Sequence, residues 1–361
     1  MAYAPVKLSD EQNRVVDQIL SSNKTERILG GYAGTGKTTV IRELNERLGG
    51  TYAICALAGK AANVLRRKGL HASTIHSLIY TLEEDDKGNT VFRRKGRHEL
   101  IYNGIIVDEY SMVNDELTDD LLSFKLPLIE VGDHGQLEPI GEGLKNKMST
   151  PDWRLETIHR NAGEIAYFCE HLRLGRPALD FKNHPHYTGQ GVVFLTKDQI
   201  KEHLVDTDQI ICAYNKTRVS INTWIRHQVG NPPEHPVPGD RVICLKSKKD
   251  MGIFNGLQGE VLQWRYPNTI QFSRDDGQPN QWIQYDPDQF NNEKGGNSLY
   301  DRSKRGLQKF DYAYCITTHK AQGDEWDSVM VIEQKCDLWD HKRWTYTAAS
   351  RAREKLYWVN E

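Results

Sequence analysis

A glycine-rich octapeptide near the start of the chain has the residues needed to bind a triphosphate. Gly31-Tyr-Ala-Gly-Thr-Gly-Lys37-Thr38 matches the pattern G-x-x-x-x-G-K-[ST] in full. Glycines let the backbone N–H groups of such a loop close around phosphate oxygens at the start of a helix. We expect Lys37 to reach the β- and γ-phosphates of ATP and Thr38 to hold Mg²⁺. The other loop residues expected to touch the nucleotide are Gly34, Thr35, Gly36 and Thr39.

Two adjacent carboxylates supply further groups for hydrolysis. Asp108 and Glu109 directly follow the apolar run Ile105-Ile-Val107. Asp108 is suited to hold Mg²⁺ through water, and Glu109 to orient and deprotonate the attacking water. An acidic pair after a strand is most often a helix start. Together with the phosphate loop, however, the pair favours an ATP hydrolase that uses Mg²⁺.

Alternating strands and helices are predicted to position these groups. A capping box, Ser9-Asp-Glu-Gln12, begins a helix ahead of the first strand. Strands are then predicted at 27–29, 51–57, 105–107 and 128–131, and helices at 37–48, 60–68 and after the cap residue Asn114. This alternation predicts an α/β fold whose parallel sheet is covered on both faces.

Two segments interrupt the α/β pattern. Within residues 83–100, turn residues at 85–89 separate β-prone stretches, which predicts a small inserted hairpin. After a proline-rich stretch, residues 237–310 contain short β-like runs separated by Gly, Pro, Asn and Asp, which predicts a small barrel-like insert. The expected domains are therefore 1–154, and 155–236 joined with 311–361.

Composition limits the partners and the compartment. The chain has 361 residues, of which 38% are hydrophobic, enough for a core in each of two or three domains. The net charge is −2, so any surface for nucleic acid has to be local. Six scattered cysteines without a Cys-x-x-Cys pair indicate reduced thiols. No signal peptide and no apolar run near ~18 residues are seen, so we expect a soluble cytoplasmic protein.

Further motifs resemble the superfamily 1B helicases, in the group typified by RecD and the bacteriophage Dda helicases. Leu8-Ser-Asp-Glu-Gln12 resembles the Q motif, whose glutamine reads adenine, although Gln12 also fits as the capping partner of Ser9. Gly132-Asp-His-Gly-Gln136 resembles motif III, whose glutamine couples the γ-phosphate to the strand-binding surface. The resemblance implies two RecA-like P-loop NTPase domains (1A and 2A), with the hairpin as 1B and an SH3-like β-barrel insert as 2B.

Three motifs in the second half of the chain extend this resemblance. The segment 155–160 resembles motif IV and 346–353 resembles motif VI, which implies that Arg160 and Arg351 act as arginine fingers. The segment 313–325 resembles motif V, which serves DNA contact and nucleotide sensing. The motif V residues implied to contact the nucleotide are Gly323 and Glu325, and those implied to contact DNA are Thr317, His319 and Lys320.

The same resemblance implies further DNA contacts. The segment 56–62 resembles motif Ia through Lys60, although Leu57-Ala58 stands where the family usually has Pro-Thr. Ser73-Thr-Ile-His-Ser-Leu78 is similar to a segment on the DNA path, which implies contacts by Thr74 and His76, but the string could simply begin a helix. Phe92 resembles the tip of a strand-separating pin, or anchors the hairpin to the core. The remaining implied DNA contacts are Asn215 and Asn255.

The resemblance implies an ATP-dependent DNA helicase that moves 5′→3′ on single-stranded DNA, in replication, repair or recombination. Expected partners are single-stranded DNA, junctions with duplex, and single-strand-binding or replication proteins; a monomer without a membrane partner is expected. One alternative is a DNA-stimulated ATPase that remodels or binds without separating strands. A GTPase or small-molecule kinase is disfavoured, because Asn215-Lys-Thr-Arg218 ends in Arg where the guanine motif has Asp. A nuclease fusion is disfavoured because no convincing carboxylate cluster is seen.

Overall fold

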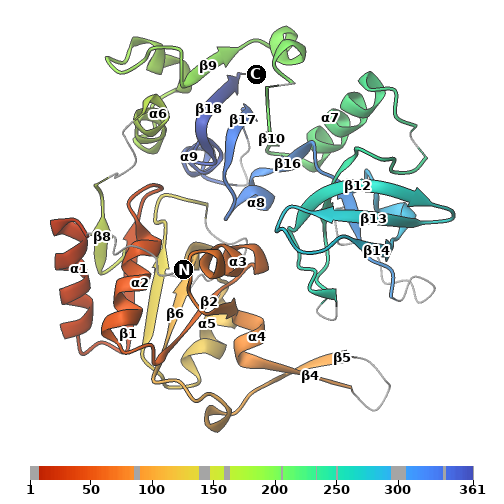
Figure 1. The fold of residues 1–361 in the computed structure, drawn as a ribbon. Helices are drawn as coiled ribbons and strands as arrows, with labels where there is room; N and C mark the ends of the chain where they lie inside the picture. The colour runs from red at the N-terminus through yellow and green to blue at the C-terminus, as the bar shows by residue number, and fades with distance from the viewer. Residues whose placement is uncertain are drawn as a thin grey trace. The chain divides into compact units, whose positions relative to one another are not determined.

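The chain forms two compact units, residues 1–162 and 163–361, which we call the first and second units. The structure, a computed structural model, describes residues 8–84, 90–137, 147–157, 163–204, 206–232, 234–248, 251–293, 306–335 and 339–360 (Figure 1). Among these residues no helix is both long and apolar enough to cross a lipid bilayer.

The first unit is built on a six-stranded parallel sheet with the strand order β3-β2-β6-β7-β1-β8. Its strands are β1 (Glu26–Gly31), β2 (Tyr52–Ala56), β3 (Ala72–Thr74), β6 (Gly104–Asp108), β7 (Leu128–Gly132) and β8 (Trp153–Leu155). Its helices are α1 (Asp10–Ser21), α2 (Lys37–Arg47), α3 (Gly59–Arg67), α4 (Ile75–Ile79) and α5 (Asp115–Leu122), with 3₁₀ turns η1 (Arg97–Glu99) and η2 (Tyr110–Met112). The predicted α/β fold with a parallel sheet is confirmed.

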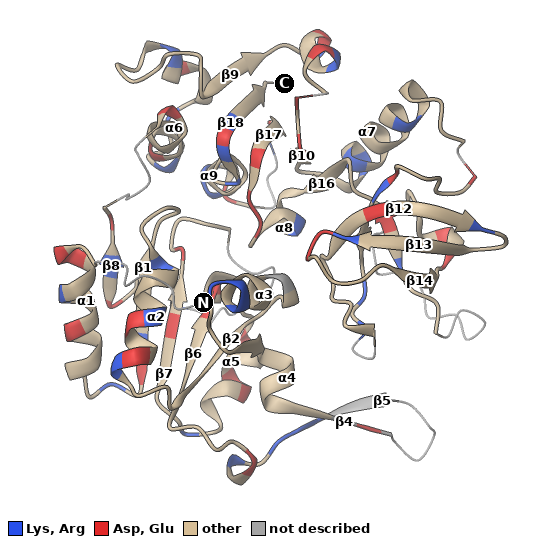
Figure 2. Ribbon diagram, in the orientation of Figure 1, with Lys and Arg blue, Asp and Glu red and all other residues tan. Residues whose placement is uncertain are grey.

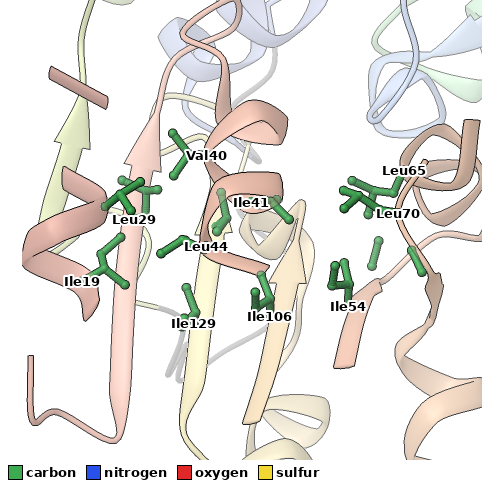
Figure 3. Close-up of a cluster of buried hydrophobic side chains, with 14 of the residues drawn as sticks. Ile19, Leu29, Val40, Ile41, Leu44, Ile54, Leu65, Leu70, Ile106 and Ile129 are labelled. Atoms are coloured by element: carbon green, nitrogen blue, oxygen red, sulfur yellow. The ribbon is translucent and has the colours of Figure 1, made fainter. Parts of the chain in front are cut away.

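Hydrophobic side chains cover both faces of this sheet. Because side chains alternate along a strand, Ile28 and its neighbour Leu29 join different core clusters. One cluster contains Leu29, Ile106 and Ile129 packed against α1 and α2 (Figure 3). The opposite cluster contains Ile28 and side chains from α4 and α5. The near-continuous apolar strands of the sequence are explained by this burial on two sides.

Short polar motifs begin the helices where the sequence predicts. The backbone N–H of Gln12 donates to Ser9 Oγ (3.2 Å), and the N–H of Ser9 donates to Gln12 Oε1 (3.0 Å), which confirms the capping box. Asn114 Oδ1 accepts from the N–H of Leu117 (3.0 Å) and begins α5, as predicted.

The hairpin within the first unit is formed by β4 (Tyr80–Glu84) and β5 (Thr90–Arg94), which pair antiparallel. In Figure 1 it extends from the end of α4. It begins at Tyr80, three residues before the expected start at 83, because the ladder continues down to the Tyr80–Arg94 pair beside α4. The turn at 85–89 lies outside the described residues.

The boundary between the units falls later than the expected 154/155. Strand β8 pairs parallel with β1, with Gly31 opposite Leu155, so Leu155 belongs to the first sheet. The Glu11 carboxylate then accepts from the N–H groups of Glu156 and Thr157, both at 3.1 Å. These contacts keep the chain after β8 within the first unit, which ends at Ala162.

The second unit contains a five-stranded parallel sheet with the strand order β16-β10-β17-β18-β9. Its strands are β9 (Val192–Leu195), β10 (Gln209–Cys212), β16 (Cys315–Thr317), β17 (Trp326–Ile332) and β18 (Ala352–Val359). Its helices are α6 (Glu164–Arg173), α7 (Asn215–Gln228), α8 (Thr318–Ala321) and α9 (His341–Ala349), with 3₁₀ turns η3 (Ala178–Asn183) and η4 (Lys197–His203).

A separate antiparallel sheet interrupts the second unit. Its strand order is β14-β13-β12-β11-β15, and η6 (Pro287–Gln289) follows its β14 strand. The strands are β11 (Arg241–Cys244), β12 (Gln258–Arg265), β13 (Thr269–Arg274), β14 (Gln281–Gln284) and β15 (Phe310–Tyr312). Val242, Val261 and Phe272 form part of its own buried core. Buried ion pairs attach it to α7: Arg218 to Asp311 (2.5 Å) and Arg226 to Asp240 (3.0 Å).

Candidate nucleotide site and strand-binding residues

Three motifs of the first unit meet at one edge of its sheet. Strands β6, β7 and β1 are neighbours and run parallel, so their carboxyl ends lie together. The phosphate loop follows β1, Asp108 and Glu109 lie at the end of β6, and the Asp133–Gln136 segment follows β7. Ligands of open α/β sheets bind beyond the carboxyl ends of the strands, which makes this edge the candidate nucleotide site.

The phosphate loop is held in a conformation that needs glycine. Gly34 and Gly36 have positive φ angles of 83° and 81°, which residues with a Cβ rarely adopt. At Gly31 a Cβ would lie 2.7 Å from Thr35 Oγ1, closer than real contacts allow. Thr35 Oγ1 also donates to the carbonyl of Tyr32 (2.9 Å). The glycines of the motif therefore serve the turn itself and the start of α2, where Thr39 lies in the first turn.

Lys37 and Thr38 lie at the start of α2, with polar partners close by. Lys37 Nζ donates to the carbonyl oxygens of Gly31 (2.8 Å) and Tyr32 (3.1 Å). Lys68 Nζ donates to Thr38 Oγ1 (3.4 Å). Nothing in the local sequence of Lys68 points to Thr38, because thirty residues and a strand separate them.

Asp108 and Glu109 form an acidic pair, in which Asp108 is buried and Glu109 is half-buried. Burial, then the charge of Glu109, raises the pKa of Asp108 to about 7, while Lys37 and Lys68 act in the opposite direction. Glu109 has a φ of 53°, uncommon for a residue with a side chain. Its Oε2 is buried and has no hydrogen-bond partner in the described part of the chain. This oxygen, beside the Asp108 carboxylate, fits a hard divalent cation, which would favour the charged forms of both groups.

Hydrogen bonds connect the acidic pair with the segment after β7. Ser111, three residues after Asp108, accepts from the Asp133 N–H (2.8 Å) and donates to its carbonyl (3.0 Å). Gln136 is 2% exposed, and its Nε2 donates to Asp133 Oδ2 (3.1 Å). The ring of His134 lies 4.3 Å from that of Tyr32 in the phosphate loop. Ser111 and His134 were missed by the sequence analysis, because neither carries a recognisable motif role.

Gln12 contacts the phosphate loop as well as its own helix start. Its Oε1 accepts from the Ser9 N–H, and its Nε2 donates to the carbonyl of Thr35 (3.0 Å). Gln12 is 5% exposed. The capping half of its expected role is therefore present, and the amide also ties α1 to the loop that precedes Lys37.

The candidate DNA-binding residues of the second unit gather around α8. Thr317 precedes this short helix, and Lys320 Nζ donates to Asn255 Oδ1 (2.9 Å), which belongs to the loop between β11 and β12. Burial lowers the pKa of His319, and burial followed by the charge of Arg218 lowers that of Lys320. Asn215 lies at the start of α7, after β10, the strand beside β16. Residues far apart in the sequence thus share one region.

Arg351 connects the two motifs that flank β17. It is 3% exposed; its Nη1 donates to the Asp324 carbonyl (3.1 Å) and its Nε to the Thr347 carbonyl (3.0 Å). Asp324 lies between Gly323, with a φ of 82°, and Glu325, which lines a cavity of about 520 Å³. These three neighbours and Arg351 therefore come together in the second unit.

The remaining predicted residues are in the first unit or outside the described structure. Thr74 Oγ1 accepts from the N–H of Ser77 (3.1 Å), so Thr74 does begin helix α4, and the His76 ring lies 5.7 Å from that of Tyr80. Arg160 lies outside the described residues, as do the side chains of Lys60 and Phe92.

Two family models match the chain. An AAA domain model matches residues 7–194, just over half of the chain. A model of the UvrD-like helicase C-terminal domain matches residues 312–359, the region that carries α8, β17, α9 and β18. The two matches cover the edge with the phosphate loop and the region around Arg351.

Curated relatives match over most of the chain. An ATP-dependent RecD2 DNA helicase of Deinococcus radiodurans is 28% identical over 97% of this chain and 48% of its own length. The chain therefore spans about half of that relative. The ATP-dependent DNA helicase dda of Enterobacteria phage T4 is 32% identical, over 74% of this chain and 69% of its own length.

Solved structures of Pif1 helicases share the fold. A crystal structure of Bacteroides Pif1 bound to ssDNA is 19% identical and covers 98% of this chain and 92% of that one, with a TM-score of 0.65. A structure of two Pif1 helicases at forked dsDNA gives a TM-score of 0.64 at 18% identity, with the same coverage. Taken with the family models and the identity to the phage helicase, these likenesses show that the chain belongs to the RecD- and Dda-like superfamily 1B helicases.

Proposed function

We propose that the chain hydrolyses ATP with Mg²⁺ at the edge formed by the phosphate loop and the acidic pair. The energy drives movement along single-stranded DNA in the 5′→3′ direction and separates duplex DNA ahead. The observation that carries the proposal is the acidic pair beside the phosphate-loop lysine, with Asp108 and the Glu109 Oε2 atom buried, in a chain of the RecD- and Dda-like family.

In this proposal the residues of the first unit perform the hydrolysis. Lys37 exchanges the carbonyls of Gly31 and Tyr32 for phosphate oxygens, since it already donates to the loop that surrounds them. Thr38 and Asp108 hold Mg²⁺, which when bound neutralises charge on the phosphates. Glu109 accepts a proton from the attacking water, because its Oε2 is buried and without a hydrogen-bond partner in the described residues.

Other residues are proposed to read the nucleotide and to complete the transition state. Gln12 contacts adenine, and Gly34, Thr35, Gly36 and Thr39 supply loop contacts. Gln136 senses the γ-phosphate; its bond to Asp133, and through Ser111 to the acidic segment, supports this role. Arg160 and Arg351 neutralise transition-state charge; Gly323 and Glu325 sense the nucleotide. For this role Arg351 has to exchange its hydrogen bond to the Asp324 carbonyl for a contact with the nucleotide's phosphate.

Strand binding is proposed at two places. In the second unit the residues are Asn215, Asn255, Thr317, His319 and Lys320; the bond between Lys320 and Asn255 supports their joint action. In the first unit they are Lys60, which follows β2, and Thr74 and His76, which lie at the end of β3 and just after it. Phosphate contacts and base stacking hold a single strand without sequence preference. We further propose that the chain acts as a soluble, cytoplasmic monomer at junctions of single- and double-stranded DNA, with single-strand-binding or replication proteins as partners.

We also propose that the first unit acts as domain 1A with the hairpin of β4 and β5 as its pin, that the parallel sheet of the second unit with its helices acts as 2A, and that the antiparallel sheet acts as an SH3-like 2B. The antiparallel pairing of β4 with β5 and the separate core of the antiparallel sheet support this division.

Strand displacement on duplexes that carry either a 5′ or a 3′ single-stranded tail tests the proposed function directly. We expect ATP-dependent displacement only with the 5′ tail. Displacement only with the 3′ tail would contradict the direction, and phosphate release that single-stranded DNA does not stimulate would contradict the motor. DNA-stimulated phosphate release without displacement from either substrate would favour the alternative, a nucleotide-switched remodelling protein.

Phe92→Ala tests the pin. If Phe92 separates the strands, the variant should lose more strand displacement than DNA-stimulated ATPase activity. Equal losses of both activities would instead favour a residue that anchors the hairpin.

A further inference from the structure

One face of the antiparallel sheet in the second unit carries an unusual set of side chains. In antiparallel pairs, residues opposite one another project on the same side. The pairing therefore places six residues on one face, which we call the outer face: Gln263, Arg265, Thr269, Gln271, Trp282 and Gln284. Their neighbours Ile270 and Ile283 are buried in the core on the other side.

An arginine lies stacked on a tryptophan of this face. The Arg265 guanidinium carbon is 3.6 Å from the centre of the Trp282 ring, across the intervening strand β13. Arg265 is exposed, and within the described residues its guanidinium makes no hydrogen bond or ion pair. The other arginines of these strands differ: Arg241 is paired with Asp275 and Arg274 with Asp276, both at 2.6 Å. The N–H donors of Arg265 are therefore available to a partner from outside the sheet.

A second aromatic ring stands beside this stack. Tyr266 directly follows Arg265 at the end of β12 and is 87% exposed. The six residues of the outer face include no carboxylate; Glu260 lies further along β12, opposite Ser273. In Figure 2, β13 and β14 are tan over most of their length, so no acidic stripe crosses them. The face thus combines π surfaces, amides and one unneutralised positive charge.

We propose that the outer face binds a segment of single-stranded nucleic acid. The Arg265 plane lies between Trp282 and an incoming base, its N–H groups reach a phosphate, and Tyr266 stacks on a neighbouring base. Guanidinium planes and aromatic rings are the groups on which unpaired bases stack. The proposal rests on the proposed function and extends it, because none of these residues is among the strand contacts proposed above.

The chemistry favours a nucleic acid strand over a proline-rich peptide. A peptide of that kind can dock on exposed aromatic rings, but it brings no anion for the free donors of Arg265. Each phosphate contact to a single strand makes binding weaken with added salt, by a slope of about 0.7 in log K against log salt. Salt dependence therefore separates the two kinds of partner.

The test is equilibrium binding of fluorescent oligothymidylates of about 6 to 30 nucleotides. The longest of these extend beyond the length of strand that a single small barrel binds. Trp282→Ala and Tyr266→Ala should each weaken binding of the longer oligonucleotides by roughly 5- to 150-fold, the loss of one stacked base. Trp282→Phe, which keeps a ring, should retain most of the affinity. Arg265→Gln should reduce the salt slope by about 0.7, whereas Trp282→Ala should leave it unchanged.

Matched controls lie elsewhere on the chain. Lys182→Gln removes a cation that also lies over a ring, 5.2 Å from the centre of Phe194, and Tyr102→Ala removes a tyrosine exposed in the first unit. Both controls should bind every oligonucleotide as the wild type does. ATPase activity without DNA should be the same in all variants, which shows that each is folded.

Two results would overturn the inference while the proposed function stands. One is wild-type affinity and salt slope in Trp282→Phe, Arg265→Gln and both alanine variants. The other is that Trp282→Ala weakens the binding of a proline-rich peptide but leaves oligonucleotide binding unchanged. A wild-type chain that binds no oligonucleotide at all would instead remove both the proposed function and the inference.

Discussion

The two units treat the carboxylates of their interiors, whole or partly buried, in opposite ways. In the first unit, Asp108 and Glu109 lie side by side at the end of β6, and burial together with this neighbour raises the pKa of Asp108. In the second unit, Asp311 and Asp240 each accept from a buried arginine of α7. One pair of carboxylates is left ready for a cation from outside, and the other two are neutralised by the chain itself.

The difference separates a candidate site from a scaffold. A buried charge costs several kcal/mol unless it is paired and hydrogen-bonded, so a fold keeps an unpaired one only where something else compensates. The arginine pairs of the second unit attach the antiparallel sheet to α7, while the carboxylates of the first unit face the phosphate loop. The same parallel-sheet architecture thus supports binding chemistry in one unit and attachment of an insert in the other.

Lys37→Ala should have the largest effect on the first of these regions. The variant removes the cation that donates to the loop carbonyls and is proposed to reach the phosphates, so ATP turnover should fall by at least ~10³-fold. Phosphate release measures turnover, and circular dichroism should show an unchanged fold. The exposed Lys197→Ala is the control. Normal ATPase activity in Lys37→Ala would refute the assignment of the loop.

Glu109→Gln tests whether the two residues of the acidic pair have different roles, with Asp108 holding Mg²⁺ and Glu109 accepting the proton of the attacking water. The amide keeps the shape of the side chain but cannot accept a proton, so kcat should fall by about 10²- to 10³-fold. ATP binding, measured by fluorescence of a labelled nucleotide, should change little. A variant that loses binding as well as turnover would show that Glu109 holds the nucleotide rather than the attacking water.

Asp240→Asn should test the scaffold side of the comparison. It leaves the Arg226 charge buried and unpaired, which should lower the free energy of unfolding of the second unit by about 3–5 kcal/mol. Urea denaturation measures the loss. The double variant Arg226→Met/Asp240→Leu, which removes both charges, should recover much of it. A double variant as unstable as Asp240→Asn would mean that the geometry of the pair, not the lone charge, matters.

Glu130→Gln should give the smallest effect, and it should raise the free energy of unfolding, whereas Asp240→Asn lowers it. Glu130 is 1% exposed, and burial, followed by the charge of Glu26, raises its pKa to about 8. Because this pKa lies above the unfolded value, Glu130 favours the folded state at low pH, and that contribution is lost as pH rises toward 8. The quantity to compare is the free energy of unfolding of the variant minus that of the wild type. This difference should therefore rise by about 3 kcal/mol in favour of the variant between pH 5 and pH 8.

Thermal unfolding of both proteins across this pH range checks the prediction for Glu130. A stability difference that does not change between pH 5 and pH 8 would contradict it. Such a result would mean that the carboxyl group titrates at the same pH in the folded and unfolded states.

The sequence by itself determined the local features of this protein. The spacing of glycines, Lys37 and Thr38 specified the phosphate loop, and the positive φ angles of Gly34 and Gly36 follow from that spacing. The Ser9 and Asn114 caps were equally readable, because a cap is an interaction over three residues. Apolar strand segments that alternate with helices indicated the parallel sheets. A strand that is buried on both faces is apolar along its whole length, so this pattern is also local.

Only the tertiary structure decided which distant residues meet. Pairing of β8 with β1 carried the first unit past the expected boundary, and folding of α3 onto the edge placed Lys68 beside Thr38. The pairing of Arg226 with Asp240 and the stacking of Arg265 on Trp282 likewise have no local signature. Strand order and register bring such residues together, and they depend on the packing of the whole sheet rather than on the few neighbours that a local pattern records.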